Sequence, residues 1–179
     1  MMEHQLSQEV IQTLNNYLDA KLKDPFRKSL SGDLVGQIHQ GEQLSMNYEA
    51  EELQEFRVIV ENLGIAYLRR FVEQTGTMIR PKQVVTDKLW SVHSYEGDYN
   101  PIHDHLTATP MGISFTTWTK VPKQIGKTAE GKEIEDYSLY NSSGAIDGFI
   151  NFTYGLNQTA DPERLRPSQS RYVKPEEGK

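Results

Sequence analysis

The sequence of 179 residues contains no cysteine. Disulfide bonds, thiolate zinc sites, iron–sulfur clusters and a cysteine nucleophile are therefore excluded for this chain. Basic residues are in the minority, because 19 Lys and Arg stand against 25 Asp and Glu and give a net charge of −6. A nucleic-acid-binding protein needs a basic face that displaces counterions, so we expect no nucleic-acid partner.

Long apolar runs are also missing. The mean hydropathy is −0.64, and no apolar run approaches the roughly 20 residues that a membrane-spanning helix needs. The N-terminal segment MMEHQLSQEV lacks the apolar h-region of a secretory signal. These absences predict a cytoplasmic protein that does not associate with a membrane, and a reducing compartment fits the lack of cysteine.

Two segments show the period of three to four residues that is typical of amphipathic helices. They cover residues 6–22 and about 50–74, and Gly76 stands where the second helix is expected to stop. After residue 76 the pattern changes to β-rich runs. We predict strands near 84–94, 101–106, 111–119, 145–153 and 170–173, an irregular segment over 24–49, and a long hairpin or insertion over 122–140.

Two helices followed by several strands predict an α+β fold, with the helices packed on one face of an antiparallel sheet or barrel. We expect one domain over residues 1–179, helical over 1–76 and β-rich over 77–179. The segment RYVKPEEGK ends directly after a Pro-x-x-Gly turn signal, and such turns normally lead into another strand. We therefore expect the last strands of the domain to be missing from this sequence.

The best candidate for a metal site lies in residues 90–105, WSVHSYEGDYNPIHDH. If the end of this stretch is a strand, His103 and His105 share one face and Asp104 points to the other. Two imidazoles two positions apart on one face can reach the same iron, zinc or copper ion. The alternative is a pair of polar residues on the solvated face of a strand. For the nearby His93, a packed or hydrogen-bonded strand residue is the favoured interpretation over a ligand.

This stretch, followed by MGISFTTWTKVP, resembles a branch of the 2-oxoglutarate/Fe(II)-dependent oxygenases. In that branch a Trp-led strand runs to a Gly-aromatic turn and then to an H-x-H, and a strand that ends in Lys-x-Pro follows. The segments LVGQIHQGEQL, GFINFTYG and YVKPEEGK resemble further blocks of the branch in the same order. The resemblance therefore covers about residues 30–179.

The resemblance implies a double-stranded β-helix, or jelly roll, with Fe(II) at one open end and 2-oxoglutarate as cosubstrate. The usual ligands of the superfamily are a proximal His, a carboxylate two residues later and a distal His. His103 matches the proximal His, and His105 stands in the carboxylate position, with Asp104 as the alternative to His105. We also expect Tyr99 and Trp118 to line the pocket.

The main departure from the family is that no histidine follows His105. The distal His and the Arg that binds 2-oxoglutarate normally lie beyond the strand after VKPEEG. We therefore expect either a hydroxylase or a truncated member of the family with impaired metal binding, whose substrate is a small molecule or a protein side chain. The alternatives are a non-catalytic jelly-roll module for binding or assembly, with a degenerate metal site, and a cupin-type metalloenzyme. An open sheet edge would invite pairing with another copy of the chain.

Overall fold

The chain divides into two units, residues 1–116 and 117–179. The structure is a computed structural model. It describes residues 2–33, 39–76, 78, 80, 82–100, 112–127, 131–133, 148–156 and 167–179.

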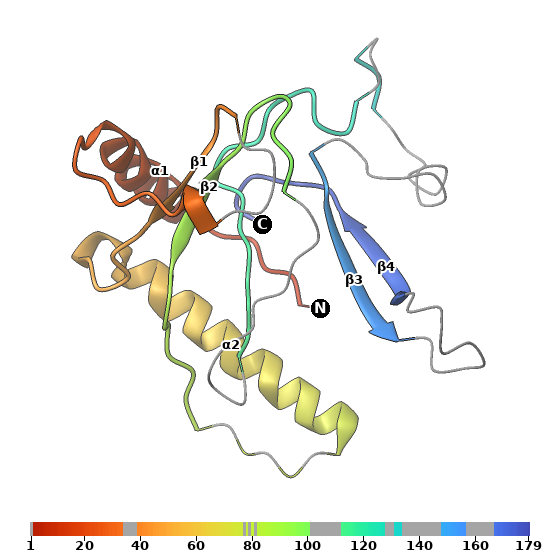
Figure 1. Ribbon diagram of the computed structural model, residues 1–179. Helices are drawn as coiled ribbons and strands as arrows, with labels where there is room; N and C mark the ends of the chain where they lie inside the picture. The colour runs from red at the N-terminus through yellow and green to blue at the C-terminus, as the bar shows by residue number, and fades with distance from the viewer. Residues whose placement is uncertain are drawn as a thin grey trace. The chain divides into compact units, whose positions relative to one another are not determined.

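The first unit contains the helices α1 (Gln8–Lys23) and α2 (Gln54–Thr75), and a 3-10 turn η2 (Glu51–Leu53) leads into α2 (Figure 1). The Oγ of Ser7 caps α1 by accepting a hydrogen bond from the backbone N–H of Val10 at 3.2 Å. Gly76 ends α2 with φ at 65°, a left-handed conformation that suits glycine, and its N–H donates to the carbonyl of Val72. Both helices predicted from the sequence, and the stop at Gly76, are confirmed.

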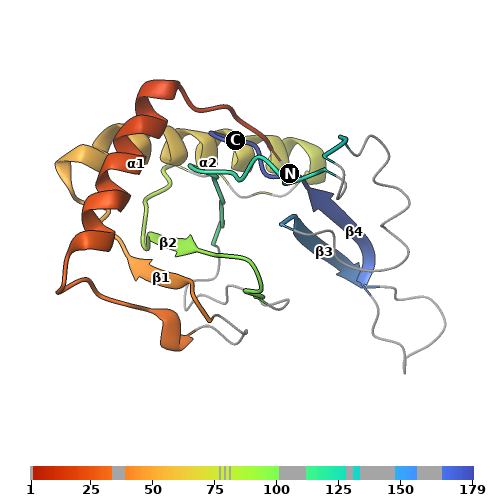
Figure 2. The same cartoon turned by 90° about the horizontal axis from the view of Figure 1, so that it is seen from above.

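The core of the first unit lies where the apolar face of α1 meets the beginning of α2. Figure 2 shows α1 beside this end of α2. Leu53 and Phe56 are almost completely buried there. Burying such a side chain contributes about 1.5–3 kcal/mol, so packing rather than helix propensity holds the two helices in place. The buried members of the core are Leu6, Val10, Ile11, Leu14, Leu18, Met46, Leu53 and Phe56.

A small antiparallel sheet completes the first unit. It pairs β1 (Glu42–Ser45) with β2 (Trp90–His93), and a 3-10 turn η1 (Ser31–Asp33) precedes β1. The register runs from Glu42 opposite His93 to Ser45 opposite Trp90. On its other edge β1 meets the segment 28–30, through a bridge between Ser29 and Leu44 and two backbone hydrogen bonds. Leu44 lies between these two neighbours and is fully buried.

The strands of the first unit differ from their predicted positions. β1 lies in the segment predicted to be irregular, because a strand of four residues with one apolar side chain is too short to show alternation. β2 occupies only four residues of the predicted strand 84–94. The prediction of a strand over 111–119 is wrong for residues 112–117, which form neither strand nor helix. Phe115 packs instead edge-on against Phe56, with ring centroids 5.8 Å apart. The predicted strand 101–106 lies outside the described residues.

The second unit is built on an antiparallel pair, β3 (Ile150–Leu156) and β4 (Pro167–Val173). Ile150 stands opposite Val173, and the ladder continues to Leu156 opposite Pro167. These strands confirm in part the predicted strands 145–153 and 170–173. β3 begins later than predicted, since residues 148 and 149 are not strand, and it continues to Leu156, while β4 begins three residues earlier than predicted. An antiparallel bridge between Lys127 and Glu133 agrees with a hairpin inside the segment 122–140.

The helices and antiparallel strand pairs confirm the α+β class. The described strands form two separate two-stranded sheets. The double-stranded β-helix stays a prediction, as does the division into a helical part over 1–76 and a β-rich part over 77–179.

Candidate functional site

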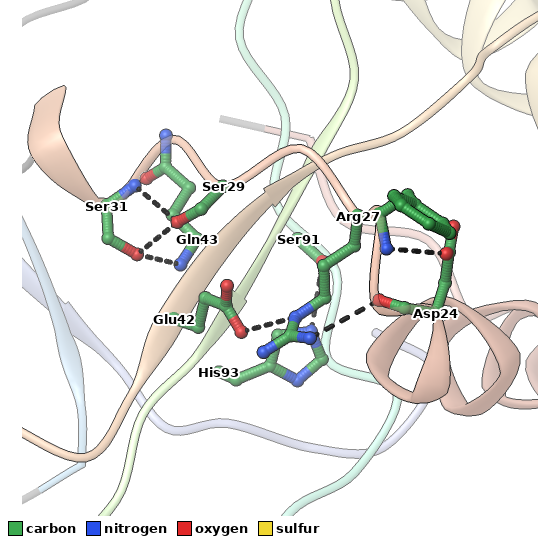
Figure 3. A network of polar contacts seen from close by, with 9 residues as sticks. Asp24, Arg27, Ser29, Ser31, Glu42, Gln43, Ser91 and His93 are labelled. Carbon is green, nitrogen blue, oxygen red and sulfur yellow. Dashed lines mark hydrogen bonds and ion pairs between the residues drawn. The ribbon is translucent and has the colours of Figure 1, made fainter.

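One face of the β1–β2 sheet carries a polar network (Figure 3). The Nε of Arg27 lies 2.9 Å from Oε2 of Glu42, and its Nη1 donates to the carbonyl oxygen of Asp24 at 3.3 Å. Glu42 and His93 are cross-strand partners, so their side chains leave the sheet on the same side. These contacts therefore connect the C-terminal end of α1 to the end of the β1–β2 sheet at which Glu42 pairs with His93.

His93 belongs to this network as a strand residue. The Oγ of Ser91 lies 3.0 Å from Nε2 of His93. The two residues are two positions apart on β2 and therefore share a face of the sheet. The hydrogen bond agrees with the interpretation of His93 that the sequence favours.

Two serines brace the other edge of β1. The Oγ of Ser31 accepts a hydrogen bond from the backbone N–H of Gln43 at 2.9 Å. The Oγ of Ser29 accepts from the N–H of Ser31 and donates to its Oγ. Hydroxyl groups thus satisfy backbone donors at this edge, where the strand ladder is short.

The turn that follows β2 is fixed by the carboxylate of Asp98. Residues 95–98 form the turn, with the N–H of Asp98 donating to the carbonyl of Tyr95 and Gly97 at a φ of 87°. One carboxylate oxygen accepts from the N–H of Tyr95 at 2.9 Å, and the other accepts from the N–H groups of His39 and Gln40 at 2.7 and 3.2 Å. Asp98 therefore fastens the segment before β1 to the turn after β2, at the end of the ladder that leads to the H-x-H motif.

These hydrogen bonds also set the charge state of Asp98. The backbone N–H of Tyr95 is the largest cause that holds the pKa of this carboxyl below its ordinary value, and those of His39, Gln40 and Gly41 add to it. Partial desolvation opposes this shift of the pKa. The ionised carboxylate is the form that accepts hydrogen bonds at both oxygens.

The predicted site residues fall in three places. His103, Asp104 and His105 lie outside the described residues. Tyr99 belongs to the first unit, directly after Asp98, and its side chain is exposed. Trp118 belongs to the second unit, where it is half-buried and its backbone pairs with residues 177–179. The roles of Tyr99 and Trp118 in one pocket stay predictions.

Within the part of the chain that the structure describes, no group of three or more His, Asp or Glu side chains is arranged to hold a metal ion. The H-x-H motif is not in that part, so its ligand role stays a prediction. No helix among the described residues is both long and apolar enough to cross a membrane.

Comparisons with protein-family models, with curated proteins and with solved structures give no match for this chain. The oxygenase resemblance therefore rests on the motifs and their order.

Sequence reasoning missed both Asp98 and the pair of Arg27 with Glu42. A signal for Asp98 was present in Tyr-Glu-Gly-Asp, because glycine before Asp favours a tight turn whose Asp can accept backbone hydrogen bonds. No sequence signal joins Arg27 to Glu42, since they are 15 residues apart and their contact depends on the pairing of segment 28–30 with β1.

Proposed function

We propose that this chain belongs to the non-haem Fe(II)/2-oxoglutarate-dependent oxygenases and has the jelly-roll fold of that family. His103 and His105 bind the metal, with Asp104 as the alternative to His105, and Tyr99 and Trp118 line the pocket. The reaction class is hydroxylation of a small molecule or a protein side chain, coupled to decarboxylation of 2-oxoglutarate.

The observation that carries the proposal is the ordered set of motifs, to which the described residues add two features. A strand does begin at Trp90, and a Gly-containing turn, followed by Tyr99, comes after it. The oxygenase branch has this succession of a Trp-led strand and a Gly-aromatic turn immediately before its H-x-H. The carboxylate of Asp98 accepts one backbone hydrogen bond within the turn and two from His39 and Gln40, which supports the succession as an ordered element.

The donor chemistry of the motif fits iron. Imidazole nitrogens are suitable ligands for Fe(II), and a facial set of three protein ligands leaves positions open for the cosubstrate and oxygen. Bound iron would supply the activation of oxygen, while the chain orients the substrate and keeps the pocket dry. The third ligand is not identified, because residues 106–179 contain no histidine. Two imidazoles alone hold Fe(II) weakly, so we expect weak metal binding by this chain.

The same lack of a later histidine favours one alternative, a non-catalytic jelly-roll module in which the H-x-H is inherited or structural. Such a module would bind a partner or assemble through its sheets, and its stability would not depend on Fe(II) or 2-oxoglutarate.

A metal titration tests the proposal. Mn(II) would replace Fe(II) to avoid oxidation, and binding would be measured with and without 2-oxoglutarate in wild-type chain and in His103→Ala/His105→Ala. The matched control is His4→Ala/His39→Ala, which removes two histidines outside the motif. We expect the wild type and the control variant to bind Mn(II), and the His103→Ala/His105→Ala variant to lose this binding. Equal binding by both double variants would refute the ligand assignment.

A further inference from the structure

The turn after α1 holds an apolar ring in the solvent. The side chain of Phe26 is 92% exposed. Its backbone N–H donates to Oδ1 of Asp24 at 2.8 Å, and the N–H of Arg27 donates to the carbonyl of Asp24. Arg27 is in turn fixed to Glu42 (Figure 3). These hydrogen bonds restrict the conformation of the turn, so the turn would lose little conformational entropy on binding a partner.

Basic side chains stand on both sides of Phe26. Lys23 precedes it and Lys28 follows it, and both are exposed. We call Lys23, Phe26 and Lys28 the basic ridge. A large apolar ring with a charged rim has the composition of a binding hot spot.

An acidic surface lies in the same unit. Glu49, Glu51, Glu52 and Glu55 are all exposed and occupy η2, the residues before it and the first turn of α2. We call these four residues the acidic patch. Its charge is opposite to that of the basic ridge.

A shallow depression of about 480 Å³ borders the acidic patch and extends to Asp24, two residues before Phe26. Tyr17 and Ala20 of α1 form part of its wall, and Glu52 of the acidic patch forms another part. Asp24, which holds the backbone of Phe26, also lines it. The depression is open to solvent, and its volume exceeds the roughly 150 Å³ at which a closed apolar cavity can hold benzene.

We propose that a second copy of this chain occupies the depression, with Phe26 of each copy inserted into the depression of the other and each basic ridge against the acidic patch of its partner. The ridge and the depression belong to one unit, and in a two-fold dimer each contact would occur twice, once in each direction. This surface is not the sheet edge considered from the sequence, and the proposal does not depend on the oxygenase assignment. The contact would rest on one aromatic side chain and a few charges, so we expect a weak dimer with a dissociation constant on the order of 100 µM.

Sedimentation equilibrium of the wild-type chain, up to about 500 µM, tests the proposal. We expect a reversible monomer–dimer equilibrium that weakens at about 0.5 M NaCl. Phe26→Ser should lower the association constant about tenfold or more. Phe71→Ser is the matched control, because Phe71 is also an exposed phenylalanine, on α2, and it should associate as the wild type does. A wild-type chain that stays monomeric over this range would overturn the proposal, and so would equal association of the two variants.

A charge exchange tests the pairing of the two surfaces. Lys23→Glu/Lys28→Glu makes the ridge acidic, and Glu51→Lys/Glu52→Lys makes the centre of the patch basic. Each variant alone should stay monomeric, because like charges then face each other. A mixture of the two should form a heterodimer, in which both contacts are again between opposite charges. A mixture that stays monomeric, or either variant forming a homodimer like the wild type, would overturn the proposed pairing.

Discussion

Gly64 of α2 packs so closely that an added methyl group meets its neighbour. A Cβ built at Gly64 would lie 2.9 Å from Cγ1 and 3.3 Å from Cγ2 of Val84, closer than the ordinary contact of about 3.5–4.0 Å. Val84 cannot withdraw easily, because its branched side chain is stiff. The segment that carries it is also fastened to α2 by the hydrogen bond from the N–H of Thr86 to Oε1 of Glu61.

Two opposing effects decide the outcome of Gly64→Ala. Replacing glycine by alanine inside a helix stabilises by about 1 kcal/mol. Forcing a methyl group into a packed contact costs about 1–3 kcal/mol. The overlap is with a stiff neighbour, so we expect the second effect to win and the free energy of unfolding to fall by about 1 kcal/mol.

Val84→Ala isolates the two effects. In the Val84→Ala background the close contact is gone. Gly64→Ala should then only raise the helix propensity of α2, and so increase the free energy of unfolding by about 1 kcal/mol. The two sites should therefore couple by about 2 kcal/mol. Urea unfolding followed by circular dichroism measures all four chains. Gly32→Ala is the control, since no atom lies within 4 Å of a Cβ there. A Gly64→Ala effect of the same sign and size in both backgrounds would refute the packing argument.

Three further predictions concern the cap, the ion pair and the acid dependence. Ser7→Ala removes the acceptor for the N–H of Val10 and should lower stability by about 1 kcal/mol in thermal unfolding. A smaller loss would show that another group satisfies that N–H. Arg27→Met breaks the pair with Glu42, whose side chains are 33% and 23% exposed. We expect a loss of only about 0.5 kcal/mol in urea unfolding, because such pairs are screened by water and salt. The folded-state pKa of Asp98 is lowered, so its stabilising contribution is complete above the ordinary value of 3.8 and is lost as the pH falls through the lowered pKa. Amide exchange at Tyr95 should accelerate over that acidic range, and exchange that does not change there would argue against the role of Asp98 in the turn.

The helices were predictable from the sequence because their signals are local. The spacing of Val10, Leu14 and Leu18 predicts the buried face of α1, and glycine predicts the end of α2 at Gly76. These features depend on residues within one or two turns of helix.

The short strands were not predictable in the same way. β1 is a strand because segment 28–30 and β2 supply its hydrogen-bond partners from both sides. Residues 112–117 have a strand-like composition, yet Phe115 packs on Phe56 and no strand forms there. Strand formation depends on a partner that is distant in the sequence.

The candidate site also has a part that local sequence signals predict and a part that depends on contacts between distant residues. Chemical type and spacing identify His103 and His105 as possible ligands, since alternation along a strand is a local rule. Asp98 binds backbone groups about 58 residues away at Gln40, and only the folded chain brings these together.

The most direct test of the metal assignment is an NMR titration of the five imidazoles with Zn(II), a diamagnetic ion that imidazole also binds. The account predicts that the signals of His103 and His105 change together with added metal, while those of His4, His39 and His93 stay in place. Changes at His93 without changes at His103 and His105, or no change at any of the five, would contradict it.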